Sequence, residues 1–207
     1  MNDPATLAQN RGRTLVLGST SRYRRELLER LHIAFGVESP DIDETPRSAE
    51  SPRELALRLA LEKAHAVARR HPQAVVIGSD QVADLHGEPL GKPGTHDRAV
   101  EQLRRMRGQT VVFQTAVAVV CEATGFEQLE LAPVSVRFRS LEDGLDDAEI
   151  ERYLRAEQPY DCAGAAKSEG LGIALLRQID SDDPTALVGL PLIRTCRMIR
   201  AAGVRLL

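Results

Sequence analysis

Asp80 stands in an apolar part of the sequence. In the segment VVIGSDQV, residues 75–77 read as a buried strand, and we expect Asp80 at the end of that strand. Ser79 and Gln81 flank the carboxylate, and Val82 resumes the apolar run. Burying a carboxylate without partners costs on the order of several kcal/mol. Asp80 is therefore either a structural group satisfied by backbone donors or a group held rigidly for chemistry.

The segment GSTSRYRR, residues 18–25, combines hydroxyl groups with fixed positive charge. It follows an apolar strand and opens a helix, where free backbone N–H groups favour anions. Arg24 and its neighbours can grip phosphate through paired hydrogen bonds. Cations near a helix N-terminus oppose the helix dipole, which favours phosphate binding over a solvated surface turn.

Further candidate groups occur in four other segments. Asp41, Asp43 and Glu44 lie in SPDIDETP and could be a solvated acidic loop or, together with Asp80, ligands for a divalent cation. The three lysines to consider are Lys63, Lys92 and Lys167, the last close to Glu169. Each of them taken alone would be interpreted as a surface residue. Together with the polar segments and Asp80, they indicate a pocket for a triphosphate and a metal. No Walker motif is present, so a P-loop enzyme is not expected.

Composition excludes several other classes of protein. A formal net charge of −3 over 207 residues argues against nucleic-acid binding. No apolar run approaches the length of a membrane span. The three cysteines are widely spaced, so we expect free thiols in a reducing compartment and a cytoplasmic protein. Residues 1–13 lack an apolar segment and predict a mobile tail.

The elements that would position these groups follow from periodicity and capping signals. Ser51, Pro52 and Glu54 form a capping box at the start of a helix, and Thr95 caps another. The remaining pattern predicts strands over 14–17, from 74, over 109–121, over 128–138 and near 173–179, with helices over 22–31, 146–158 and 191–203. We expect an α/β (mixed α+β) fold: a curved mixed sheet flanked by helices, with two lobes around a cleft.

The ordered motifs resemble those of the Maf-like nucleoside triphosphate pyrophosphatases. The resemblance runs from about residue 15 to about residue 200 and consists of STS-x-x-RR-x-LL, DIDETP, ELALRLALEKA, VIGSDQV, GKP and CAG-x-x-KSEG-x-G. GSDQV and KSEG are similar to the 7-methyl-GTP pyrophosphatase branch. The resemblance implies one nucleotide-binding domain over residues 14–207, related to inosine triphosphate pyrophosphatases. It also implies a Mg²⁺- or Mn²⁺-dependent hydrolysis of a nucleoside triphosphate to the monophosphate and pyrophosphate, and it is compatible with a homodimer.

The resemblance also implies roles for individual residues. Asp80 matches the proton acceptor, and the sequence leaves open whether it takes a proton or holds the metal. Residues for substrate choice are Tyr23, Gln81 and Glu169; residues of the phosphate and metal pocket are Ser19, Arg24, Glu44, Lys63, Lys92 and Lys167.

Two residues depart from the family pattern. Arg22 replaces a usual Pro, and Tyr23 stands where the branch often has Trp. An aromatic face attracts a cationic base by about 0.5–2 kcal/mol, so Tyr23 preserves the type of contact with a smaller ring. Two alternatives stay open: hydrolysis of other non-standard purine triphosphates, and a nucleotide-binding regulator of cell division without turnover.

Overall fold

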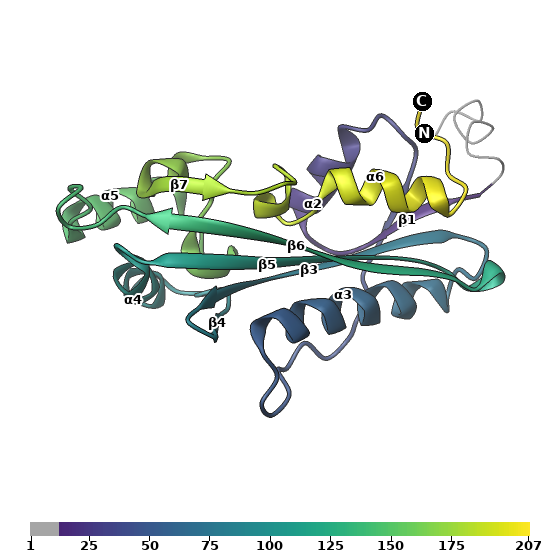
Figure 1. Cartoon of the computed structure of the whole chain (residues 1–207), viewed down its shortest axis with the longest axis horizontal. Coiled ribbons are helices and arrows are strands. Elements are labelled where there is room, and N and C mark those ends of the chain that lie inside the picture. The colour runs from purple at the N-terminus through teal and green to yellow at the C-terminus, as the bar shows by residue number, and fades with distance from the viewer. Residues whose placement is uncertain (1–12) are drawn as a thin grey trace.

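A seven-stranded mixed sheet forms the centre of the molecule in a computed structural model that describes residues 13–207. The strands are β1 (Leu15–Gly18), β2 (Gly36–Glu38), β3 (Val75–Leu85), β4 (Glu88–Leu90), β5 (Thr110–Cys121), β6 (Phe126–Phe138) and β7 (Leu176–Asp180). Their order is β2-β1-β3-β5-β6-β7, and β4 pairs with one end of β3 (Figure 1). β1 pairs in parallel with β2 and β3, whereas the other pairings are antiparallel.

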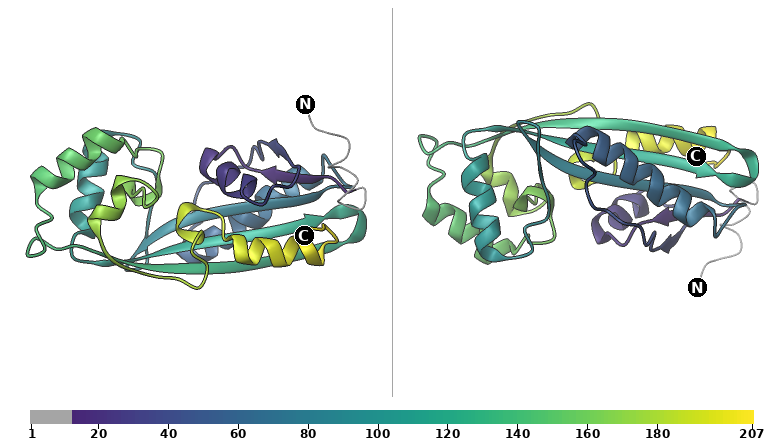
Figure 2. Two further views of the ribbon diagram at one scale, coloured as in Figure 1. Left: turned by 90° about the horizontal axis from the view of Figure 1, so that it is seen from above. Right: turned by 90° about the horizontal axis from the view of Figure 1, so that it is seen from below.

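Helices divide the molecule into two lobes that share the sheet. Helix α3 (Pro52–Ala68) covers one face, and α2 (Arg22–Glu29) with α6 (Leu192–Ala201) covers the other. Helices α4 (His96–Met106) and α5 (Asp147–Glu157) gather over the opposite end of the long strands around a separate apolar cluster (Figure 2). The predicted mixed α/β fold with two lobes is confirmed. Within residues 13–207, no helix combines the length and apolar composition needed to cross a membrane.

Local signals located most helix starts correctly. The Ser51–Glu54 capping box is present at α3, and the Thr95 side chain caps α4. Two boundaries differ from the prediction: the segment 171–175 is a 3₁₀ helix that precedes β7, and β3 does not end at Asp80 but continues to Leu85. The predicted tail over 1–13 lies outside the described residues except for Arg13, whose Nη1 donates to the Ala202 carbonyl at 2.7 Å.

The alternation of β3 sends neighbouring side chains to opposite faces of the sheet. Val75 and Ile77 belong to the cluster under α2 and α6, whereas Val76 and Val82 belong to the cluster under α3. Because side chains alternate along a strand, Asp80 faces α3 while its neighbours face α6.

Gly78 lets α3 lie against β3. A Cβ at this position would lie 2.3 Å from the Ala60 carbonyl oxygen and 2.6 Å from the Ala64 amide nitrogen. Both atoms are helix backbone, so a larger residue would force the helix away from the strand. This close approach places Lys63, on the same turn, over Asp80.

A gap in strand pairing opens the sheet beside Asp80. β1 pairs with β3 only as far as the partners Gly18 and Gly78, and β4 begins pairing at Ala83 with Leu90. Residues 79–82 therefore have a strand partner only on the β5 side. The loops after β1 and β2 converge on this opening.

Candidate active site

A cleft of about 780 Å³ opens at this gap between the two lobes. The loops after β1 and β2, helix α3, the middle of β3, the segment after β4, and residues 161–169 and 187–189 all contribute to its lining. Every candidate site residue named above except Asp43 and Lys167 lines the cleft. The structure thus brings together side chains that are up to 150 positions apart in the chain, from Ser19 to Glu169.

The centre of the cleft is an ion-pair cluster around Lys63. Its Nζ lies 2.6 Å from Asp80 Oδ1 and 2.8 Å from Glu44 Oε1. Lys63 is 4% exposed and Asp80 7%, whereas Glu44 lies at the exposed side of the cleft. Asp80 is therefore buried with a specific cationic partner.

Arg24 supplies a second cation beside this cluster. Its Nε donates to the Gly189 carbonyl at 2.9 Å, and its Nη1 donates to the Ser19 hydroxyl at 3.4 Å. Burial lowers the pKa of Arg24, against the opposing effect of the Asp80 and Glu44 charges. Burial alone would raise the pKa of Glu44, but the Lys63 hydrogen bond and the surrounding cations outweigh it and lower that pKa. The pocket therefore favours the ionised carboxylate.

Tyr23 stands at the rim of the cleft, where its ring is already in contact with a cation. The Arg22 guanidinium lies 4.7 Å from the ring centroid, and its Nη2 donates to the Tyr23 hydroxyl at 2.6 Å. That hydroxyl lies 3.4 Å from Asp161 Oδ1 and 3.6 Å from Cys162 Sγ. Burial raises the pKa of Tyr23, so the phenol stays neutral at physiological pH.

The amide of Gln81 is fixed by the protein. Its Nε2 donates to the Thr115 hydroxyl at 2.9 Å and to the carbonyls of Ala186 and Leu187 at 2.9 and 3.0 Å. An amide NH₂ carries two protons, so these acceptors use its donor capacity in full. The carbonyl oxygen Oε1 is then the Gln81 atom with capacity for a ligand, and it acts as an acceptor.

Lys167 does not join the cleft. Its Nζ pairs with Glu157 at the end of α5, and its backbone N–H donates to the Tyr153 hydroxyl at 3.1 Å. Lys167 therefore lies outside the cleft in this structure, because a nearby carboxylate pairs with its ammonium, and its role in phosphate binding stays a prediction. Glu169, two residues on, does line the cleft, and burial raises its pKa.

Several lining groups gave no signal in the sequence. The carbonyl of Gly189 holds Arg24, and it also accepts from the Ser79 hydroxyl at 2.9 Å. Backbone acceptors have no residue type of their own, so residue patterns cannot predict them. Asp161 and Cys162 at the rim could have been inferred only from their position beside the CAG motif.

The acidic loop before α3 contributes unevenly. Asp41 lines the cleft while Asp43 turns back to its own backbone, accepting from Thr45 N at 2.9 Å. In the part of the chain that the structure describes, no group of three or more His, Cys, Asp or Glu side chains is arranged to hold a metal ion.

Comparisons with known proteins find relatives that match nearly the whole chain. A protein named 7-methyl-GTP pyrophosphatase from Polaromonas sp. is 74% identical over 98% of this chain and 90% of its own length. Proteins of the same name from Albidiferax ferrireducens and Cupriavidus pinatubonensis are 67% and 58% identical over 94% and 91% of this chain, and 96% and 93% of their own lengths. The structure of the Staphylococcus aureus Ham1 protein superposes with a TM-score of 0.44 at 17% identity, over 61% of this chain and 72% of that chain, too distant a likeness to bear on function.

The family described as Maf-like protein matches residues 14–202, which include every candidate site residue. The resemblance inferred from the motifs is confirmed, and this chain belongs to the Maf-like protein family.

Proposed function

We propose that this protein hydrolyses 7-methyl-GTP to 7-methyl-GMP and pyrophosphate by water attack on the α-phosphorus. The observation that carries the proposal is that one cleft holds the buried Asp80–Lys63 pair and is lined as well by Arg24, an aromatic ring (Tyr23) and a second carboxylate (Glu169). The names of the relatives described above support the same substrate.

The deep end of the cleft suits a triphosphate. Arg24, Lys63 and Lys92 place three cations around it, and Ser19 adds a hydroxyl. Such preorganised charges stabilise the negative charge that develops on the transferred phosphate and on the leaving pyrophosphate. Asp80 lies among them, where it either accepts a proton from the attacking water or holds the metal that lowers the pKa of that water.

The residues present fit a divalent cation. Glu44 and Asp80 both direct an oxygen at the Lys63 ammonium, so two carboxylates already converge on one positive centre. Mg²⁺ is usually bound by one or two carboxylates together with substrate phosphates, which agrees with the lack of a larger ligand cluster in residues 13–207. We propose Mg²⁺ or Mn²⁺ held by Glu44 and Asp80. When bound, such an ion supplies charge neutralisation at the phosphates and lowers the pKa of water.

The rim of the cleft suits a cationic base. N7-methylation places positive charge on guanine, and the Tyr23 ring and the Glu169 carboxylate would compensate that charge from two directions. Gln81 Oε1 adds an acceptor. The Arg22 guanidinium lies against the face of the Tyr23 ring, so it must move away or contact the ring together with the base when the base binds.

We also propose a single domain and a cytoplasmic location for this protein. Residues 14–207 form one domain, which is supported by strands that run through both lobes. The protein acts in the cytoplasm, which is supported by three free thiols at Cys121, Cys162 and Cys196.

A panel of nucleoside triphosphates with Mg²⁺ or Mn²⁺, assayed for pyrophosphate, tests the function. We expect 7-methyl-GTP to be hydrolysed with the highest kcat/KM, and Asp80→Asn to fold but lose turnover. Equal turnover of many purine triphosphates would favour the broader activity, and binding without turnover would favour a regulator. Wild-type turnover by Asp80→Asn would refute the catalytic assignment.

A further inference from the structure

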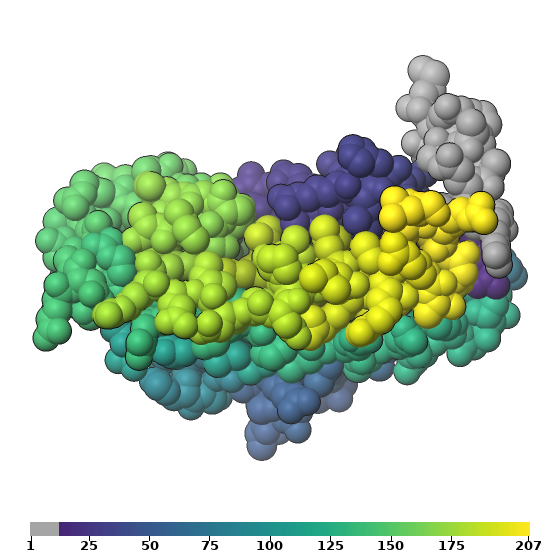
Figure 3. Space-filling view, turned by 45° about the horizontal axis from the view of Figure 1, so that its top comes forward, coloured from purple at the N-terminus to yellow at the C-terminus, as the bar shows by residue number. Residues whose placement is uncertain are grey.

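The segment of residues 183–190, between β7 and α6, holds the polar side chains next to Asp80; we name it the clamp segment. Its backbone carbonyls accept from Gln81 Nε2 at 2.9 and 3.0 Å, from the Ser79 hydroxyl at 2.9 Å and from Arg24 Nε at 2.9 Å. Figure 3 shows the face of the molecule on which this C-terminal part of the chain, in yellow-green, lies beside the early part of the described chain, in purple. The orientation of the base-facing amide therefore depends on how this segment is folded.

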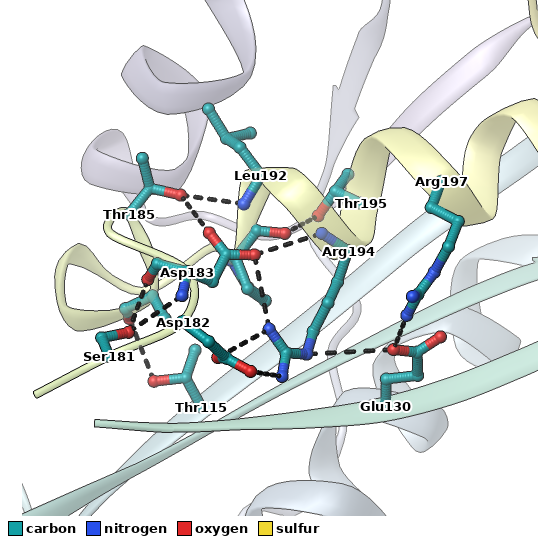
Figure 4. Close-up of polar contacts among 12 residues, drawn as sticks. Thr115, Glu130, Ser181, Asp182, Asp183, Thr185, Leu192, Arg194, Thr195 and Arg197 are labelled. Carbon is teal, nitrogen blue, oxygen red and sulfur yellow. Dashed lines mark hydrogen bonds and ion pairs between the residues drawn. The ribbon is translucent and has the colours of Figure 1, made fainter. Parts of the chain in front are cut away.

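Asp183, at the start of the clamp segment, is fully buried at 0% exposure. Its Oδ2 accepts from the backbone N–H of Arg194 at 3.1 Å, and its Oδ1 lies 3.2 Å from the Thr185 hydroxyl (Figure 4). Aspartate is almost never fully buried unless it is paired. The catalytic proposal uses no part of this carboxylate.

Asp183 and Thr185 together fasten both ends of the clamp segment to α6. The helix follows Pro191, whose side chain makes no capping bond, and Asp183 caps the third residue of the helix instead. The Thr185 hydroxyl accepts from Leu192 N and donates to the Leu190 carbonyl, each at 2.8 Å. These contacts close the segment into a loop whose carbonyls point toward β3.

We propose that Asp183 is a positioning residue for base recognition. This inference rests on the proposed function. The buried carboxylate fixes the conformation of the clamp segment, and the segment fixes the orientation of the Gln81 amide plane. Gln81 Oε1 then contacts the edge of the base. Asp183 touches neither the phosphates nor the attacking water in this arrangement, so it governs choice of base more than the rate of cleavage.

The test measures discrimination, the ratio of kcat/KM for 7-methyl-GTP to that for GTP. In Asp183→Ala we expect discrimination to fall about three- to tenfold, the size of one hydrogen bond. The loss should lie in KM for 7-methyl-GTP, because Asp80 keeps its contact with Lys63. In Gln81→Ala we expect a similar fall, and the double variant should lose no more than Gln81→Ala alone, since both changes act through one side chain.

Conservative and control variants separate positioning from stability. Asp183→Asn should restore discrimination, because its amide oxygen can accept from Arg194 N while its NH₂ donates to Thr185. Asp146→Ala removes a comparable cap, from α5 in the other lobe, where Asp146 accepts from Glu149 N at 2.7 Å. It should lower Tm and leave discrimination unchanged.

The outcomes distinguish the inference from the function on which it rests. Unchanged discrimination in folded Asp183→Ala, or additive losses in the double variant, would overturn the inference while 7-methyl-GTP hydrolysis stands. If Asp183→Ala does not fold, Thr185→Val removes the same fastening isosterically, and unchanged discrimination there overturns the inference equally. A wild-type protein that failed to hydrolyse 7-methyl-GTP would overturn both.

Discussion

Replacement of Lys63 by Met tests whether the centre of the cleft is a buried ion pair. The substitution keeps a long side chain on α3 but removes the ammonium 2.6 Å from Asp80 Oδ1. Asp80, 7% exposed, is then left as a buried charge without its direct partner. Glu44 also loses this partner, but it is exposed, so its half of the cluster adds little to stability.

The expected magnitude follows from burial. Removing one partner of a buried pair costs about 3–5 kcal/mol, because the remaining charge is uncompensated. A chain of this size changes Tm by about 2–4 °C for each kcal/mol, so Lys63→Met should lower Tm by about 6–20 °C. Asp80→Asn should cost less, about 1–3 kcal/mol, because the amide oxygen still accepts from Lys63 and Lys63 keeps Glu44.

Urea unfolding with linear extrapolation measures these differences. The double variant Lys63→Met with Asp80→Leu replaces both charges by apolar groups and should recover stability relative to Lys63→Met, since such replacements are often neutral or stabilising. A loss below about 1 kcal/mol in Lys63→Met would refute the reasoning, because a cost that small is typical of surface pairs. A double variant whose loss of stability equals the sum of the two single losses would refute the reasoning too.

Three further predictions concern packing, pH dependence and thiol chemistry. Gly78→Ala should lower the free energy of unfolding by about 1–3 kcal/mol or more, because its Cβ meets the Ala60 carbonyl at 2.3 Å; an unchanged urea midpoint would contradict this packing. The Arg58 hydrogen bond lowers the pKa of Glu50 from 4.5 to about 2, so the stabilisation from this ion pair is present above pH 4.5 and is lost as the pH falls towards 2. In Arg58→Met, acid unfolding followed by circular dichroism should therefore begin at higher pH. An unshifted unfolding midpoint would argue against the pair. Burial raises the pKa of Cys162 to about 11, so the rate of alkylation of the Cys162 thiol, followed by mass spectrometry of the peptide that contains it, should rise up to that pH. Nucleotide bound in the cleft should slow this alkylation, because Cys162 lines the cleft. A midpoint of the alkylation rate near pH 9 would instead show an accessible thiol.

Local sequence signals predicted which side chains line the cleft better than they predicted the contacts among those side chains. The capping box at Ser51 and the Thr95 cap depend on three or four consecutive residues, so they were readable in the sequence. Asp80 read as the end of a strand because polar residues surround it. In the structure, hydrogen bonds with β5 continue through these residues to Asp84, and no local pattern reveals that pairing.

Long-range competition explains why Lys167 lies outside the cleft. Its motif places Lys167 with the phosphate ligands, but Glu157, ten residues earlier, lies within reach once α5 ends. Glu157 also accepts from Leu171 N at 2.8 Å, so it fastens both sides of the loop that carries Glu169. The Lys167 ammonium, paired with Glu157, therefore helps to hold the loop in place. That loop positions Glu169, which lines the cleft.

The two faces of β3 explain how neighbouring residues of one strand can present the carboxylate proposed for catalysis and the amide proposed for base recognition. Asp80 points to α3 and meets Lys63, while Gln81 points to the opposite face and meets the clamp segment. A shift of one residue in the register of β3 would exchange these side chains, placing the amide against Lys63 and the carboxylate against backbone carbonyls, where it would be repelled. The register is held by β5 along nine residue pairs from Val76 to Asp84. The missing strand partner at residues 79–82 therefore opens the sheet for a ligand without loosening the strand that presents both groups.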